Sequence, residues 1–142
     1  MKVAEIVVKI LEDEGKVTSQ AESRGKRTSK TFSITPAGKK EFSDWIAAPA
    51  VDESRRNELL LKLFFGASVP QKIIIKQLEL KQKRVKETLQ RFNDIEKNVV
   101  SQVSDQYEHK RFWTMTLRNG ILHAKAELKW LAECIRLLEN NT

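Results

Sequence analysis

The chain has 142 residues, which is enough for one ordinary domain or for two small ones that share a core. With 40% hydrophobic and 32% charged residues it is neither a disordered tail nor a membrane-embedded protein, and no apolar run approaches the roughly 20 residues of a membrane span. A formal net charge of +7 favours a polyanionic partner, most often nucleic acid and less often an anionic membrane.

The first predicted element is an amphipathic helix over residues 2–14. Its apolar residues recur at helical spacing: Val3, Ile6, Val7, Ile10 and Leu11. Gly15 suits the left-handed position that ends such a helix.

A hairpin follows, because the period of the pattern changes to two. Val17, Ser19 and Ala21 alternate with polar residues, as do Phe32 and Ile34 after a basic loop. This alternation predicts two strands with one apolar face.

The next helix begins at Thr35 and Pro36, which are a good N-cap and a good first helical residue. Pro49 ends it nearby. Phe42, Trp45 and Ile46 are expected to form its buried face.

The remainder of the chain is predicted to be helical. A short apolar helix covers residues 54–66 and ends at Gly66. A long helix then opens at Ser68 and Pro70, and its apolar stripe consists of Ile74, Leu78, Val85, Leu89, Phe92, Ile95, Val99 and Val103. A bend within residues 105–109 follows it. The last helix carries a seam with heptad spacing: Leu117, Ile121, Ala124, Leu128, Leu131, Ile135 and Leu138.

Helix, basic hairpin, helix is the order of the second half of a winged helix-turn-helix. In that fold the hairpin, or wing, presents cations such as Arg24, Lys26, Arg27 and Lys30 to DNA phosphates. The alternative is a solvated hairpin whose cations only aid solubility, and the charges alone do not separate the two.

The cations in the first half of the long helix allow two interpretations as well. They are Lys72, Lys76, Lys81, Lys83, Arg84, Lys86 and Arg91. A solvated polar face explains them, and a second contact strip for DNA is the sharper alternative.

Two motifs resemble the PadR family of bacterial transcriptional regulators. The helix end LEDEG, residues 11–15, resembles the family's acidic helix end, and FSITPAG, residues 32–38, resembles its passage from wing to helix. ELLLKLFFG, residues 58–66, and the pattern from Trp113 to Leu131 resemble its helical domain. The resemblance covers nearly the whole chain.

The resemblance implies a mainly α fold with a two-stranded β wing: a partial winged-helix domain over residues 1–48 and a helical dimerisation domain over residues 54–142. In the family two further helices precede the stretch that begins here, so we expect weak, nonspecific DNA binding from this chain. The expected DNA-contacting residues are Lys2, Arg24, Lys26, Arg27, Thr28 and Lys30.

The implied function is a DNA-binding transcriptional regulator that binds operator DNA as a homodimer, with the sign of regulation left open. Some relatives stack aromatic effectors on interface aromatics, which makes Trp113 and Trp130 candidate ligand residues. The alternative is an interaction module that only dimerises. The expected dimer interface consists of Phe64, Phe65, Trp113, Leu117, Ile121, Leu128, Leu131 and Ile135.

Other chemistry is not indicated. The only cysteine, Cys134, allows no intrachain disulfide, which together with the absence of a signal peptide favours the cytoplasm. His109 and His123 have no second ligand at metal-binding spacing, and no nucleophile constellation occurs. We therefore expect no metal, no cofactor, no membrane association and no enzymatic activity.

Overall fold

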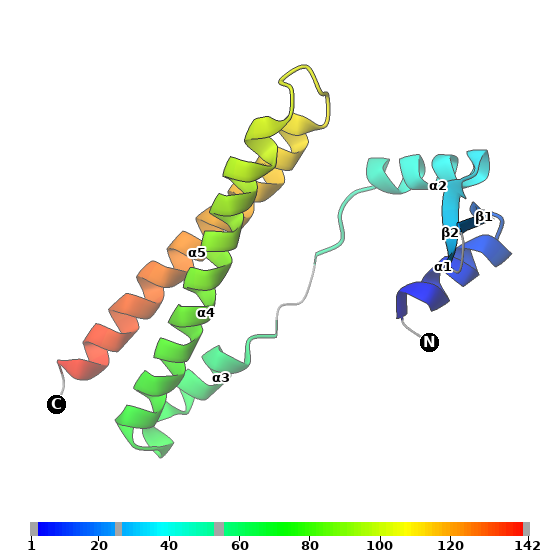
Figure 1. The fold of residues 1–142 in the computed structure, drawn as a ribbon. Coiled ribbons are helices and arrows are strands. Elements are labelled where there is room, and N and C mark those ends of the chain that lie inside the picture. The colour runs from blue at the N-terminus through cyan, green and yellow to red at the C-terminus, as the bar shows by residue number, and fades with distance from the viewer. Residues whose placement is uncertain (1–2, 25–26, 53–55, 141–142) are drawn as a thin grey trace. The chain divides into compact units, whose positions relative to one another are not determined.

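The structure is a computed structural model that describes residues 3–24, 27–52 and 56–140, and it divides into two compact units, Met1–Arg55 and Arg56–Thr142 (Figure 1). The first unit contains α1 (Val3–Asp13), β1 (Val17–Arg24), β2 (Arg27–Ile34) and α2 (Pro36–Ala47). The second contains α3 (Glu58–Phe64), α4 (Gln71–Asn98) and α5 (Lys110–Glu139), with short 3₁₀ turns at Gly66–Ser68 and Val100–Gln102. The predicted fold class, mainly α with a two-stranded wing, is confirmed.

The wing is an antiparallel pair whose register follows the period-two pattern. Val17 lies opposite Ile34, and Ser19 lies opposite Phe32, so the apolar residues of both strands share a face. Both strands are longer than the alternation alone indicated, because the pairing continues to Arg24 and Arg27.

The ends of α1 and the start of α2 agree with the sequence signals. Gly15 has a φ of +69°, the left-handed conformation expected after a helix. The side chain of Thr35 caps α2, and Pro36 is its first residue.

The predicted buried face of α2 is wrong for this chain. Phe42, Trp45 and Ile46 are all exposed, with Trp45 at 71%. The apolar residues of α1 are also exposed or only half-buried, because α1 and α2 meet few other elements within the unit. Helical spacing correctly placed these residues on one face but did not provide anything to cover it.

The short helix α3 differs at both ends from the prediction. It begins after Asn57, whose side-chain oxygen accepts a hydrogen bond from the Leu60 amide at 3.3 Å. Phe65, rather than Gly66, caps its end, and Gly66 starts a 3₁₀ turn without adopting a positive φ.

The helices α4 and α5 form an antiparallel hairpin, which contains the hydrophobic core of the second unit (Figure 1). The core consists of Ile74, Leu78, Val85, Ala124 and Leu131. α4 ends at Asn98, so Val99 and Val103 of the predicted stripe lie in the connection to α5. The predicted bend at residues 105–109 falls within that connection.

The two helices approach closely at Gly120. A Cβ atom at that position would lie 2.8 Å from the ring of Phe92 on α4, which is too close for an ordinary contact. The absence of a side chain at Gly120 therefore lets Phe92 pack against the backbone of α5.

Candidate nucleic-acid interface

The predicted DNA-contacting residues gather at the far end of the wing. Arg24 and Arg27 form the pair of residues nearest the loop, and Thr28 pairs with Ser23 one position farther from it. Lys30 follows on β2 opposite Ala21, and its side chain is exposed. Lys2 and Lys26 lie outside the described residues. The hairpin thus brings Arg24, Arg27, Thr28 and Lys30 to one end of a two-stranded ribbon.

The base of the wing is held by the hydroxyl group of Thr35. This hydroxyl lies 2.8 Å from the Gly15 carbonyl and 3.1 Å from the Lys16 carbonyl, to which it can donate. It accepts a hydrogen bond from the Gly38 amide at 3.1 Å. One side chain therefore joins the end of α1, the start of β1 and the first turn of α2.

Gly38 explains the glycine of the wing-to-helix motif. It is the only buried residue among those described in the first unit. A Cβ atom there would lie 2.2 Å from the Lys16 carbonyl oxygen and 3.0 Å from Ile34. Only glycine lets the first turn of α2 pack directly on the base of the hairpin.

The acidic helix end has a structural role too. The Lys16 ammonium lies 2.6 Å from Glu14 and 2.8 Å from Glu41, and these carboxylates raise its pKa, with the Glu14 hydrogen bond as the largest cause. Ser19 donates a hydrogen bond to Glu12. The role of Lys16 was not predicted from the sequence, although its position next to Glu14 was a signal for local pairing.

The residues predicted for the dimer interface separate into two groups. Ile121 and Leu131 are buried in the core of the second unit, at 2% and 0% exposure, so their side chains have almost no surface left for another molecule. Leu117, Leu128 and Ile135 are half-buried. Phe64, Phe65 and Trp113 are exposed, with Phe64 at 82%.

The two tryptophans predicted as ligand residues do not share a site. They are 17 positions apart on α5, which corresponds to about 25 Å along a helix. Trp113 lies near the connection between the helices, with its ring centroid 5.4 Å from that of Tyr107. Trp130 lines an open groove of about 800 Å³ near the other end of the hairpin, together with Leu63, Ile74, Cys134 and other apolar residues.

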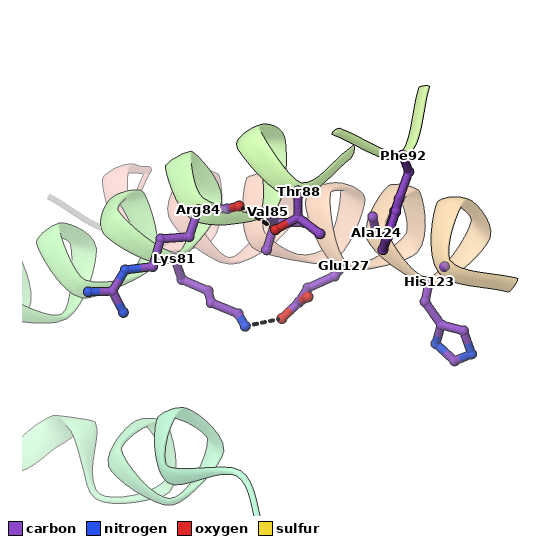
Figure 2. A pocket seen from close by; sticks show the side chains of 9 residues that line it. Lys81, Arg84, Val85, Thr88, Phe92, His123, Ala124 and Glu127 are labelled. Carbon is purple, nitrogen blue, oxygen red and sulfur yellow. Dashed lines mark hydrogen bonds and ion pairs between the residues drawn. The ribbon is translucent and has the colours of Figure 1, made fainter. Parts of the chain in front are cut away.

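A second groove crosses the middle of the hairpin (Figure 2). Lys81 of α4 and Glu127 of α5 form an ion pair of 3.1 Å across it, and Val85, Phe92 and Ala124 supply an apolar floor. The imidazole of His123 points away from the helices in Figure 2. Two of the cations singled out on α4, Lys81 and Arg84, therefore border this groove.

The described residues contain no group of three or more potential metal ligands close enough to hold an ion. Over the same parts of the chain, none of the helices has the length and apolar character needed to cross a membrane.

Residues 55–139 match the protein family described as virulence activator alpha C-term, and this segment is more than half of the chain. The chain belongs to this family. The segment that matches the virulence activator family includes α3, α4 and α5, so it corresponds to the second unit. A search of curated protein sequences gave no match.

Solved structures similar to this family member extend the likeness to the wing. Bacillus subtilis PadR in complex with operator DNA is 20% identical, with a TM-score of 0.78 over 96% of this chain and 78% of that chain. A PadR-like transcriptional regulator from Bacillus cereus is 20% identical, with a TM-score of 0.78 over 97% and 76%. The Vibrio cholerae virulence activator AphA is 20% identical, with a TM-score of 0.72 over 97% and 77%. At these identities the comparison establishes a shared PadR-like fold, which confirms the resemblance found in the sequence motifs. The names of all three proteins describe regulators and not enzymes.

Proposed function

We propose that the chain is a DNA-binding transcriptional regulator of PadR type that binds operator DNA as a homodimer. The observation that carries this proposal is the wing. A two-stranded ribbon, held at its base by Thr35 and Gly38, ends in Arg24 and Arg27 in a fold shared with a PadR protein solved on operator DNA.

Phosphate contact is the chemistry that the wing suits best. Arginine forms strong, bidentate hydrogen bonds to phosphate, and a ribbon held at its base loses little conformational entropy when it docks. Contacts of this kind position a protein on DNA without reading its sequence.

Exposed apolar surface on the second unit supports the homodimer. Leu60, Leu61, Phe64 and Phe65 are all more than half exposed on or just after α3, and the groove of about 800 Å³ lies beside them. Patches of this kind commonly mark an interface between proteins. A two-fold axis through this surface would let each copy cover the aromatic residues of the other.

An effector is a further part of the proposal. Bacillus subtilis PadR has also been solved in complex with p-coumaric acid, a planar aromatic molecule. In this chain the groove that contains Trp130 offers an apolar surface of suitable chemistry. We therefore assign Trp130, and not Trp113, to the candidate effector site.

A second candidate function is an interaction module that dimerises without binding a specific operator. The observation that favours it is the exposed apolar surface of the first unit, where Val3, Val7 and Ile10 are each at least 48% exposed. Such a face would suit packing against another polypeptide.

A salt titration of DNA binding distinguishes these functions. Replacement of Arg24, Lys26 and Arg27 by alanine should weaken binding to every duplex and flatten the salt dependence by about 0.9 for each phosphate that is no longer neutralised. Lys9, Lys39 and Lys40 replaced together in the same unit provide a control with the same change of charge. Unchanged affinity and salt slope in the wing variant would contradict the wing as the DNA contact.

Sedimentation equilibrium tests the dimer. Phe64→Asp places a charge on an exposed surface position, so the chain should still fold while the proposed interface is disrupted. We expect a dimer for the wild-type chain and a monomer for this variant at about 10 to 50 µM, a range in which obligate interfaces are normally occupied. A monomeric wild-type chain in this range would contradict the homodimer.

A further inference from the structure

The positive charge of the chain is concentrated in the helical unit. Residues 56–142 contain 16 lysines and arginines against 10 acidic residues, which gives a formal charge of +6. Residues 1–55, which include the wing, contain 10 lysines and arginines against 9 acidic residues, so their formal charge is only +1. The basic balance that suggests a polyanionic partner thus belongs mainly to the unit that does not contain the wing.

Cations of α5 form a row along one flank of that helix. Arg118 and Lys125 are seven residues apart, as are Lys129 and Arg136, and all four are exposed. Two helical turns contain about 7.2 residues, so residues seven apart leave the helix in nearly the same direction. Around the helix axis the four side chains fall within about 40° of one another. The row is about 27 Å long at about 1.5 Å per residue.

Four exposed lysines form a comparable row on α4. They are Lys72, Lys76, Lys83 and Lys86. At about 100° per residue, these four side chains fall within about 80° of one another around the axis of α4. They lie on the flank of the helix that is turned away from Arg84 and Thr88.

The two rows lie on the same face of the hairpin. The helices are antiparallel, since Gln71 donates to the carbonyl of Leu138, Lys81 pairs with Glu127, and Phe92 packs on Gly120. The groove in Figure 2 marks one face of the pair, lined from α4 by Arg84 and Thr88 and from α5 by His123 and Glu127. Each cation row is directed away from the groove residues of its own helix, so the rows share the opposite face. We call these eight residues the basic face.

The charges of the basic face are poorly neutralised within the chain. Across residues 56–140, the described ion pairs include none of the eight cations. Five carboxylates lie beside the rows, those of Glu79, Glu87, Asp94, Glu133 and Glu139, so eight positive charges face five negative ones. By contrast, Lys81 on the groove side is paired with Glu127.

We propose that the basic face binds the phosphate backbone of duplex DNA, as a contact surface additional to the wing. Duplex DNA carries about one negative charge per 1.7 Å of its axis, so a rigid row about 27 Å long meets many phosphates at once. The lysines and arginines would contact phosphates without reading bases, and would raise affinity for any sequence. This inference rests on the proposed DNA-binding function.

Two other uses of the basic face fit the structure less well. A two-fold dimer contact would bring the same cations of two copies together, and like charges repel across an interface. Association with a membrane surface requires a continuous apolar face, whereas the large exposed apolar residues that border the rows, Leu80 on α4 and Met115 and Leu122 on α5, stand among charged residues.

The test compares two variants with the same change of charge. One carries Lys76→Gln, Lys83→Gln, Arg118→Gln and Lys125→Gln, and the control carries Arg56→Gln, Lys62→Gln, Arg84→Gln and Arg91→Gln on other parts of the same unit. Binding of the full chain to a 30-base-pair duplex of arbitrary sequence is measured by fluorescence anisotropy from 50 to 200 mM KCl. We expect the basic-face variant to bind at least about tenfold more weakly at 100 mM salt, with a salt slope lower by about 3, and the control to stay within about threefold of wild type.

Further variants make each outcome decisive. Substitutions that keep the charge, namely Lys76→Arg, Lys83→Arg, Arg118→Lys and Lys125→Arg, should retain wild-type binding, and equal melting temperatures exclude a folding defect. Wild-type binding by the basic-face variant, or an equal weakening in the control, would overturn the proposal. If the basic-face variant no longer binds vesicles that contain 30% phosphatidylserine but still binds DNA like the wild type, the DNA proposal is overturned in favour of a membrane. If wing variants bind normally while the basic-face variant does not, the wing proposal fails and the basic face stands.

Discussion

The two units of the molecule are stabilised in different ways. Among the described residues, all seven buried hydrophobic ones belong to the second unit, where α4 and α5 enclose Leu78 and Leu131 completely. In the described part of the first unit only Gly38 is buried, and the elements are joined by the hydrogen bonds of Thr35 and the ion pairs of Lys16. The contrast shows that a regular wing can form from local polar contacts, while the long hairpin depends on buried apolar area.

This difference predicts how sensitive each unit is to mutation. Truncation of a buried apolar residue removes transfer free energy and leaves a cavity, whereas truncation of an exposed one does neither. In the first unit the sensitive positions should instead be those where backbone groups approach closely or receive a capping hydrogen bond.

The largest expected effect is in the core of the hairpin. Leu131→Ala should lower the free energy of unfolding of the second unit by about 2–5 kcal/mol, because the side chain is fully buried against α4. The matched change in the first unit, Phe42→Ala, should cost less than about 1 kcal/mol, since Phe42 is 54% exposed. Urea unfolding followed by circular dichroism measures both, and equal decreases would contradict the comparison.

A smaller effect is expected at the base of the wing. Gly38→Ala would place a Cβ atom 2.2 Å from the backbone oxygen of Lys16, so the first turn of α2 must move away from the hairpin. We expect a decrease of about 1–3 kcal/mol in the stability of the first unit, as in other overpacked sites. Amide hydrogen exchange of residues 17–21 and 31–34 should report it. Ala37→Ser, at the exposed neighbouring position, is the control and should leave exchange unchanged.

Removal of the helix cap should cost somewhat less. Thr35→Ala removes the acceptor of the Gly38 amide and the donor to the Gly15 and Lys16 carbonyls, so we expect a decrease in stability of about 1 kcal/mol or slightly more. Thr35→Ser keeps the hydroxyl and should retain most of the stability, which the same hydrogen-exchange measurement can determine. A serine variant as unstable as the alanine variant would show that the methyl group, and not the hydrogen bonds, holds the base of the wing.

The smallest effects concern exposed ion pairs. The direction of the pKa shift, and with it the pH dependence of stability, is opposite in the two units. In the second unit the Lys110 ammonium, 2.6 Å from Asp105, lowers the pKa of that carboxyl below its ordinary value of 3.8. The pair therefore stabilises the folded chain above the ordinary pKa and loses its effect as the pH falls through the lowered one. An NMR titration should show the Asp105 pKa returning toward its ordinary value in Lys110→Gln.

In the first unit the sign is reversed. The pKa of Lys16 is raised above its ordinary value of 10.5, so its stabilising contribution is complete below that value and is lost as the pH rises through the higher one. Glu14→Gln should reduce the shift more than Glu41→Gln, because the hydrogen bond to Glu14 is its largest cause. An NMR titration of the Lys16 side chain measures both, and the reverse order would contradict the geometry at the base of the wing.

The sequence alone located those element boundaries that local signals mark. Thr35 and Pro36 start α2, Gly15 ends α1, and the change from helical to alternating spacing locates β1 and β2, because these signals act within a few residues of chain. The wing motifs also predicted the PadR-like fold, since Thr35 and Gly38 have local structural roles that only a few residue types can fill.

The tertiary structure decided what covers each apolar face. The expected dimer interface grouped Ile121 and Leu131 with Phe64 and Trp113, but the first two are buried within the second unit and the others are exposed. Periodicity grouped Phe42, Trp45 and Ile46 on one face of α2, which remains exposed in this chain. The spacing of residues along one helix establishes which side chains share a direction, whereas burial depends on which other element packs there, and that contact joins residues far apart in the sequence.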